Sequence, residues 1–328
     1  MMAWSDRHCR YFLRLLAPQA LLYTEMVVAQ AILRGDTRRL LEFDAAEHPV
    51  ALQLGGSDPA QLAAAARLGE AAGYDEINLN VGCPSDRVQN ATFGACLMAD
   101  PAKVAAGVAA MRAKVAVPVT VKCRIGIDAM DDYGFLERFV TTVALGGCDT
   151  FIVHARSAIL KGLSPRQNRE IPPLRYPQVW RLKAEHPELN VVINGGIRTL
   201  AGAREQWAQV DGVMVGREAY HNPYFLAALE GAANGGAPAP EPSEIVARMK
   251  PYLERELARG TPLASVTRHL LGLYAGRAGA RSWRRALSEL SRRAGAGPEV
   301  LEAAAKAAAR GADAPREAGE IGFRTSGL

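Results

Sequence analysis

The chain has 328 residues, of which 49% are hydrophobic and 22% are charged, a composition typical of a soluble globular protein. No apolar run approaches the ~20 residues needed to span a bilayer, and the first ten residues are charged where a signal peptide is apolar. We therefore expect a cytoplasmic protein with no membrane contact. Its five cysteines are scattered and lack CxxC spacing, which argues against a disulfide framework and against a metal site.

The net charge of +5 is concentrated in the C-terminal part of the chain. Residues 241–328 carry 15 Lys and Arg against 10 Asp and Glu, whereas residues 1–240 carry 24 of each. This asymmetry suggests a neutral catalytic body with a basic appendage, which suits a polyanionic partner. A solvated charged face is the alternative interpretation.

Short apolar segments alternate with helical patterns along the first 217 residues. Ser5 is a plausible N-cap for the first, amphipathic helix. We expect strands over residues 21–26, 49–56, 76–81, 118–124, 150–156, 190–197 and 211–217. We expect helices over residues 28–41, 58–72, 101–114, 133–145, 177–185 and 199–209.

This alternation predicts an α/β fold with a parallel sheet covered on both faces, either doubly wound or closed as a barrel. Polar residues follow the C-terminal ends of successive strands instead of clustering at one switch point, which favours a (β/α)8 TIM barrel. Such a barrel needs eight strands, and the sequence indicates seven. We therefore expect the first strand to precede Met1.

The composition changes after residue 230. We expect a catalytic barrel domain over residues 1–230 and a linker rich in Gly, Ala, Asn and Pro over residues 231–242. A helical domain follows over residues 243–310, and residues 311–328 are expected to form a flexible tail. Helices are predicted in the helical domain over residues 245–259, 266–275, 281–293 and 298–310.

A thiol follows the third predicted strand. Cys83 stands where the strand pattern breaks at Gly82-Cys83-Pro84, at the strand end where a barrel enzyme keeps its chemistry. A free cysteine is more often a small buried hydrophobe than a reactive group. Residue type alone therefore leaves the role of Cys83 open.

Three other strand ends carry an amide, a cation and an imidazole. Gln53, Lys122 and His154 would line the mouth of the barrel, where such groups can hold the polar edge of a flavin. Each has a structural alternative: Lys122 could pair with Glu25, and His154 could be a satisfied interior histidine.

Two late strand ends predict an anion site. Asn194-Gly195-Gly196 and Gly216-Arg217 each precede a helix, so bare backbone amides would point at a phosphate group. A pair of ordinary tight turns is the alternative. Because no GxGxxG follows the first strand, a mononucleotide suits these positions better than a dinucleotide.

Together these runs resemble the tRNA-dihydrouridine synthase family over about residues 1–290. The run Glu-Ile-Asn-Leu-Asn-Val-Gly-Cys-Pro-Ser at residues 76–85 is highly specific to that family. Further matching runs are Ser5–Arg10, Gln53–Gly56, Val121–Arg124, His154–Arg156, Asn194–Ile197 and Val215–Arg217. The segments 154–168 and 279–285 are similar to the DusA branch, which the resemblance implies acts on uridines 20 and 20a.

The resemblance implies FMN as cofactor, NADPH as electron donor and the D-loop of tRNA as partner, and we expect a monomer without a metal. The implied reaction reduces the C5=C6 bond of uridine, with hydride passing from reduced FMN to C6 and a proton from Cys83 to C5. A cysteine thiol of ordinary acidity is protonated at neutral pH and can donate. The implied FMN contacts are Met1, Gln53, Lys122, His154, Asn194, Gly195, Gly196, Gly216 and Arg217. The implied tRNA contacts are Asn80, Arg166, Arg169, Arg281 and Arg284.

Family members begin with a strand that ends in Ala-Pro-Met, of which this sequence contains only Met1. A start codon missed upstream would account for the difference. Two other functions stay open: an FMN barrel that acts on a free pyrimidine, similar to dihydroorotate dehydrogenases, and an N-terminally truncated, inactive copy that only binds tRNA. The basic helical appendage counts against the free pyrimidine.

Overall fold

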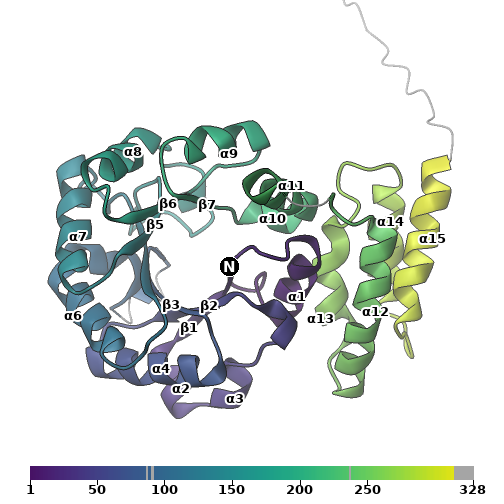
Figure 1. Cartoon of the computed structure of the whole chain (residues 1–328). Coiled ribbons are helices and arrows are strands. Elements are labelled where there is room, and N and C mark those ends of the chain that lie inside the picture. Colours follow the sequence, from purple (N-terminus) through teal and green to yellow (C-terminus); the bar gives the residue numbers. More distant parts are fainter. Residues whose placement is uncertain (86–87, 90–91, 236–237, 314–328) are drawn as a thin grey trace, which may run out of the picture. The chain divides into compact units, whose positions relative to one another are not determined.

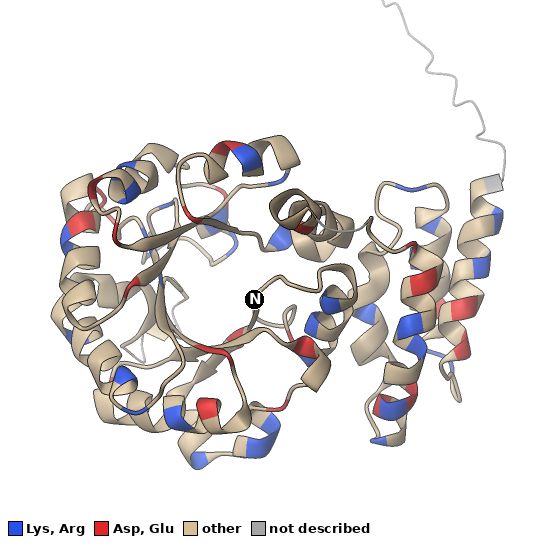
Figure 2. Ribbon diagram, viewed as in Figure 1, with Lys and Arg blue, Asp and Glu red and all other residues tan. Residues whose placement is uncertain are grey.

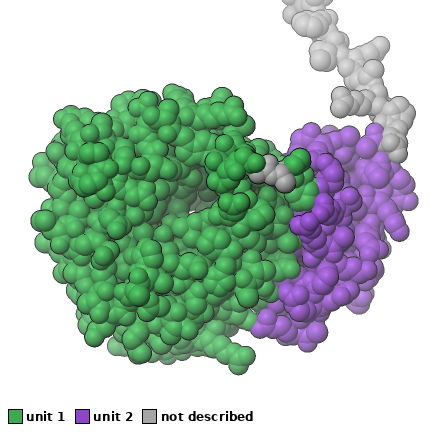
Figure 3. All heavy atoms as spheres, viewed as in Figure 1, with its two compact units in different colours: residues 1–240 green, residues 241–328 purple. Residues whose placement is uncertain are grey.

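The computed structural model describes residues 1–85, 88–89, 92–235 and 238–313. The chain divides into two compact units, Met1–Pro240 (unit 1) and Glu241–Leu328 (unit 2), coloured separately in Figure 3. Most of the predicted tail, residues 314–328, lies outside the described residues. Within the described part, no helix combines the length and the apolar character needed to cross a bilayer.

Unit 1 is built on a seven-stranded parallel sheet whose spatial order follows the sequence. Its strands are β1 Leu22–Val28, β2 Val50–Gly55, β3 Glu76–Val81, β4 Val119–Arg124, β5 Thr150–His154, β6 Asn190–Asn194 and β7 Gly212–Met214. A doubly wound sheet reverses its strand order at a switch point, and this sheet has no such reversal. The sheet curls into a TIM-barrel-like fold (Figure 1), which confirms the predicted fold class.

Helices follow the strands and lie outside the curled sheet (Figure 1). The α-helices of unit 1 are α1 Arg7–Leu16, α2 Ala29–Arg34, α3 Thr37–Leu40, α4 Pro59–Ala72, α6 Pro101–Arg112, α7 Tyr133–Leu145, α8 Tyr176–Glu185, α9 Leu200–Trp207, α10 Arg217–His221 and α11 Pro223–Asn234. Short 3-10 helices are η1 Ala45–Glu47, η2 Gly94–Ala99 and η3 Gln167–Arg169.

Several helix boundaries differ from the predictions. The N-cap of α1 is Asp6 and not Ser5, and the helix predicted over residues 266–275 is divided into a helix over Leu263–Thr267 and a 3-10 helix over Arg268–Gly272.

The helix predicted over residues 28–41 is divided into α2 and α3, because Gly35 ends the first and Asp36 caps the second by accepting the N–H of Arg39 at 3.1 Å. Helix α11 continues to Asn234, so residues 231–234 of the predicted linker are helical.

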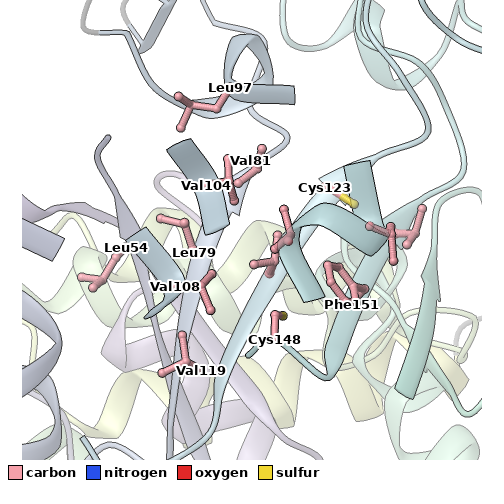
Figure 4. Packing of buried hydrophobic residues seen from close by; sticks show 14 of the residues in the cluster. Leu54, Leu79, Val81, Leu97, Val104, Val108, Val119, Cys123, Cys148 and Phe151 are labelled. Atoms are coloured by element: carbon pink, nitrogen blue, oxygen red, sulfur yellow. The ribbon is translucent and has the colours of Figure 1, made fainter. Parts of the chain in front are cut away.

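The alternation along β3 separates two environments. One set of side chains joins the hydrophobic core: Ile77, Leu79 and Val81. Figure 4 shows Leu79 and Val81 among their neighbours in this core. A Cβ added at Gly69 of α4 would lie 2.9 Å from Ile77 Cδ1, so that glycine lets α4 pack closely on this face of the sheet. The alternate residues point to the inside of the curl: Glu76, Asn78 and Asn80.

Unit 2 is helical. Its elements are α12 Pro242–Ala258, α13 Leu263–Thr267, η4 Arg268–Gly272, α14 Ala280–Leu290 and α15 Glu299–Asp313. Trp283 is fully buried and its Nε1 donates to the carbonyl of Leu270 at 2.8 Å. Gly279 has a φ of +78°, and a Cβ there would lie 2.0 Å from the carbonyl oxygen of Ala308, so α14 can begin against α15 only with glycine. Charges of both signs are spread over unit 2 (Figure 2).

Candidate functional site

Five of the predicted site residues lie at the C-terminal ends of consecutive strands of unit 1. Gln53 belongs to β2, Asn80 to β3, Lys122 to β4, His154 to β5 and Asn194 to β6. The strand register pairs Asn80 with Lys122 and His154 with Asn194. The fold therefore brings these side chains together at one rim of the curled sheet, and the surface of unit 1 is hollowed in the view of Figure 3.

Lys122 faces an amide instead of a carboxylate. Its Nζ donates to Asn194 Oδ1 at 3.3 Å, and Asn194 Nδ2 donates onward to the carbonyl of Met214 at 2.7 Å. Among the described residues, Glu25 instead accepts the backbone N–H of Ala3, so the predicted alternative, an ion pair between Lys122 and Glu25, is not formed. Burial, with repulsion from Arg124, lowers the pKa of Lys122 to about 8. Burial thus disfavours the charged ammonium group, which would gain from an anionic ligand.

His154 is a neutral imidazole among cations. Burial is the main reason why its pKa lies well below the usual value, and the charges of Arg124, Lys122, Arg156 and Arg217 add to the effect. Four positive groups around one uncharged ring make the rim electropositive. Such a site suits a phosphate group or an anionic ring.

The predicted anion site has a bare backbone. Gly195 and Gly196 have φ angles of +114° and +71°, which favour glycine. A Cβ at Gly195 would lie 2.8 Å from Cδ2 of the His154 ring, and one at Gly216 would lie 3.2 Å from Met1 Sδ. A side chain at Gly195 would collide with the imidazole and one at Gly216 would press on Met1, so both positions need a residue without a side chain.

An arginine cluster lies beside this rim. Arg217 Nη1 donates to Glu170 Oε1 at 2.8 Å, and its Nη2 donates to the carbonyl of Arg169 at 3.2 Å. Arg166 is 3.8 Å from Glu170 and its side chain is 82% exposed. Burial, followed by repulsion from Arg217, lowers the pKa of Arg169. Two guanidinium groups thus pair with the Glu170 carboxylate and the third, that of Arg169, lies in its electrostatic range, which leaves a surplus of positive charge at the rim.

Cys83 lies on a tightly held loop directly after β3. Asn80 Oδ1 accepts the backbone N–H groups of Gly82 at 3.1 Å and Cys83 at 3.0 Å. The N–H of Ala95 donates to the Cys83 carbonyl at 2.9 Å, and the Cys83 thiol lies 3.5 Å from the Ser85 hydroxyl. The partly exposed thiol therefore has a defined position near the other strand-end residues.

Arg124 holds the same loop, a role that the sequence predictions missed. The buried side chain donates from Nε to the carbonyl of Gly82 at 2.9 Å and from Nη1 to the carbonyls of Ser157 and Asn168, both at 3.0 Å. It thereby joins the loops that follow β3 and β5. In the sequence, only the presence of a charged residue at the end of an apolar strand points to Arg124. Lys122, two residues earlier on the same strand, gives the same signal.

The two predicted tRNA contacts of unit 2 lie on one face of α14. Arg281 and Arg284 are exposed, whereas Trp283 and Leu287 are buried on the opposite side of the helix. A spacing of three residues places the two guanidinium groups one turn apart. In the part of the chain that the structure describes, neither arginine forms an ion pair.

Comparison with known proteins identifies one family. Residues 1–309 match the family described as Dihydrouridine synthase (Dus). A tRNA-dihydrouridine(20/20a) synthase of Salmonella typhi is 58% identical over 308 residues, which cover 93% of this chain and 92% of that protein. Proteins of the same name from Vibrio cholerae and Escherichia coli K12 are 56% and 58% identical over 93% of this chain, and the matches cover 93% and 89% of those proteins.

Proposed function

The chain belongs to the dihydrouridine synthase family of flavin-dependent oxidoreductases, and we propose that it reduces uridines 20 and 20a of the tRNA D-loop. FMN is the proposed cofactor and NADPH the proposed electron donor. The main support for the proposal is that a thiol (Cys83), an amide (Gln53), a cation (Lys122) and a neutral imidazole (His154) lie at one rim of the sheet. Relatives named for positions 20 and 20a support the choice of substrate.

The residues at the rim suit FMN. Gly195 and Gly196 carry no side chain that could cover their N–H groups, and Arg217 near them is a fixed cation, so this end suits the phosphate. Lys122 and Gln53 would meet the polar edge of the ring system. An ammonium group whose pKa burial has lowered to about 8 gains stability from a negative charge placed near it.

The chain itself supplies the proton of the reaction. Bound FMN in its reduced form would provide a hydride for C6 of the uridine. Saturating the C5=C6 bond then requires one proton at C5, and we assign it to Cys83 Sγ. The bonds from Asn80, Ala95 and Arg124 to the loop support this role, because a proton donor must be held within reach of the accepting carbon.

Two groups of cations would bind the RNA. Arg166 and Arg169 stand at the rim of unit 1, and Arg281 and Arg284 stand on the exposed face of α14. Asn80 is the proposed contact to the target nucleotide. Taking a base out of its stack costs a few kcal/mol, roughly, and phosphate contacts can offset this cost. We accordingly assign the chemistry to residues 1–230, which also hold the target nucleotide, and a second set of tRNA contacts to the helical domain over residues 243–310.

The test is the product formed on tRNA. The full chain, loaded with FMN and supplied with NADPH, would be incubated with an unmodified tRNA transcript, and dihydrouridine would be located by mass spectrometry of RNase fragments. We expect it at positions 20 and 20a. Turnover of orotate without any product on tRNA would instead establish an oxidoreductase of free pyrimidines. If the protein, freed of unbound FMN after FMN addition, showed no flavin absorbance band near ~450 nm, the remaining function would be that of an inactive copy that only binds tRNA.

A further inference from the structure

A line of polar side chains runs along the inside of the curled sheet. The interior of a parallel barrel is normally filled by layers of branched aliphatic residues. Here four interior residues from β2, β3 and β4 are polar, and each is at most 9% exposed: Gln53, Glu76, Asn78 and Thr120. From Glu76 at the start of β3 to Asn80 near its end, the line spans about 13 Å.

Each member of the line is hydrogen-bonded to the next. Thr120 Oγ1 donates to Glu76 Oε1 at 2.6 Å, and Asn78 Nδ2 donates to Thr120 Oγ1 at 2.8 Å. Gln53 Nε2 donates to Asn78 Oδ1 at 2.9 Å, and Asn80 Nδ2 donates to Gln53 Oε1 at 2.8 Å. The register places Gln53 opposite Asn78 and Asn78 opposite Thr120, so the backbone itself brings these partners together.

The groups at both ends of the line fix the same direction of donation, from Asn80 toward Glu76. At the upper end, the backbone N–H groups of Gly82 and Cys83 can only donate, so Asn80 must turn its oxygen to them and its NH2 group to Gln53. At the lower end, Glu76 Oε1 accepts from Thr120 and also from the hydroxyl of Tyr23, at 2.7 Å. Every amide between these ends therefore has one orientation that satisfies its neighbours.

We propose that Glu76, Thr120 and Asn78 form a positioning relay that determines which end of the Gln53 amide faces the flavin. The inference rests on the proposed function, because Gln53 is a proposed FMN contact. The three relay residues touch neither cofactor nor substrate; they act through Gln53, which Asn80 holds from the other side. If the relay is broken at Thr120, Asn78 Nδ2 loses its acceptor and the Asn78 amide can turn its NH2 group toward Gln53. Gln53 then faces NH2 groups from both Asn78 and Asn80, and its amide no longer has one orientation that satisfies both neighbours.

If Thr120 served only to pack the interior of the sheet, FMN binding would respond differently to substitutions of this residue. Replacing both partners of a hydrogen bond by apolar groups of the same shape can be nearly neutral for stability, whereas removing one partner leaves the other unsatisfied. Stability therefore does not separate the two roles, and the FMN affinity of the folded variants is the measurement that does. A relay requires the hydroxyl of Thr120, which is donor and acceptor at once, and does not require its methyl group. Packing inside the sheet requires the volume of Thr120 and does not require its hydroxyl.

The test compares Thr120→Val with Thr120→Ser in the full chain. Valine keeps the shape and removes the hydroxyl, whereas serine keeps the hydroxyl and removes a methyl group. FMN dissociation constants of the flavin-free proteins would be measured by quenching of FMN fluorescence. We expect the valine variant to bind FMN at least about tenfold more weakly, as expected for the loss of an oriented hydrogen bond, and the serine variant to stay within about threefold of the parent. The opposite order would overturn the relay.

A second measurement separates the relay from the flavin chemistry. Side-chain NH2 signals of Gln53 and Asn78 would be followed by 15N NMR in the flavin-free chain. We expect Thr120→Val to shift both signals and accelerate their hydrogen exchange. Glu76→Gln, which keeps an acceptor oxygen, should leave both close to the parent. Unchanged signals in Thr120→Val would overturn the relay whether or not FMN binds, and absence of FMN binding in the parent protein would refute the proposed function alone.

Discussion

Replacing Arg124 by methionine would release the loop that carries Cys83. The side chain makes three hydrogen bonds to carbonyl groups, each worth about 1.5–3 kcal/mol for a charged donor. Burial opposes them, since it lowers the Arg124 pKa from 12.5 to about 10, which corresponds to about 3 kcal/mol. The net loss in Arg124→Met is therefore about 3 kcal/mol of local stability.

Hydrogen exchange of the Gly82 and Cys83 amides measures this loss directly, because both N–H groups are bonded within the loop. A change of about 3 kcal/mol in the free energy of local opening corresponds to exchange about a hundredfold faster. Arg175→Met is a matched control, since Arg175 pairs with Asp131 at 2.8 Å in the same unit and, among the described residues, donates to Asp131 and not to the loop that carries Cys83. Equal exchange in Arg124→Met and the parent chain would refute this account of the loop.

Two further predictions concern charge. A protonated Lys122 favours FMN binding, and burial lowers the pKa of Lys122 to about 8 in the free protein, so FMN affinity should fall as the pH rises through 8. Lys122→Met should bind FMN more weakly and lose this pH dependence between pH 7 and 9. An unchanged pH profile in the variant would contradict the assigned contact. Arg281→Glu and Arg284→Glu should each weaken tRNA binding and reduce its salt dependence, without changing FMN affinity. Arg310→Glu, an exposed position on α15, is the control, and equal losses in all three variants would point to net charge instead of a defined RNA contact.

Local patterns were enough to predict most of the fold. The alternation of apolar and polar residues predicted β3 with the observed bounds, Glu76–Val81, and the polar residues after successive strands correctly favoured a barrel. The same pattern predicted that Lys122, His154 and Asn194 would meet, since parallel strands end at one rim. The flavin and RNA roles of these residues remain predictions, because their assignment came from the family resemblance.

Contacts between strands could not be predicted in the same way. Asn78 is an ordinary polar position in the sequence, and its role in the relay follows only from the register that places Thr120 and Gln53 beside it. Arg124 bonds to residues more than 30 positions away, so no local pattern reveals its function. Lys122 was given Glu25 as a possible partner on charge alone, whereas the curled sheet places it against Asn194.

The most direct test of the proposed reaction is dihydrouridine formation by Cys83→Ala beside the parent protein. Both proteins would be loaded with FMN, supplied with NADPH and incubated with the same unmodified tRNA, and dihydrouridine at positions 20 and 20a would be measured over time by mass spectrometry. We predict equal flavin content in the two proteins, product at both positions with the parent, and a rate at least about a hundredfold lower in the variant, the size expected for loss of a general acid. Equal rates would contradict the assignment of the proton to Cys83.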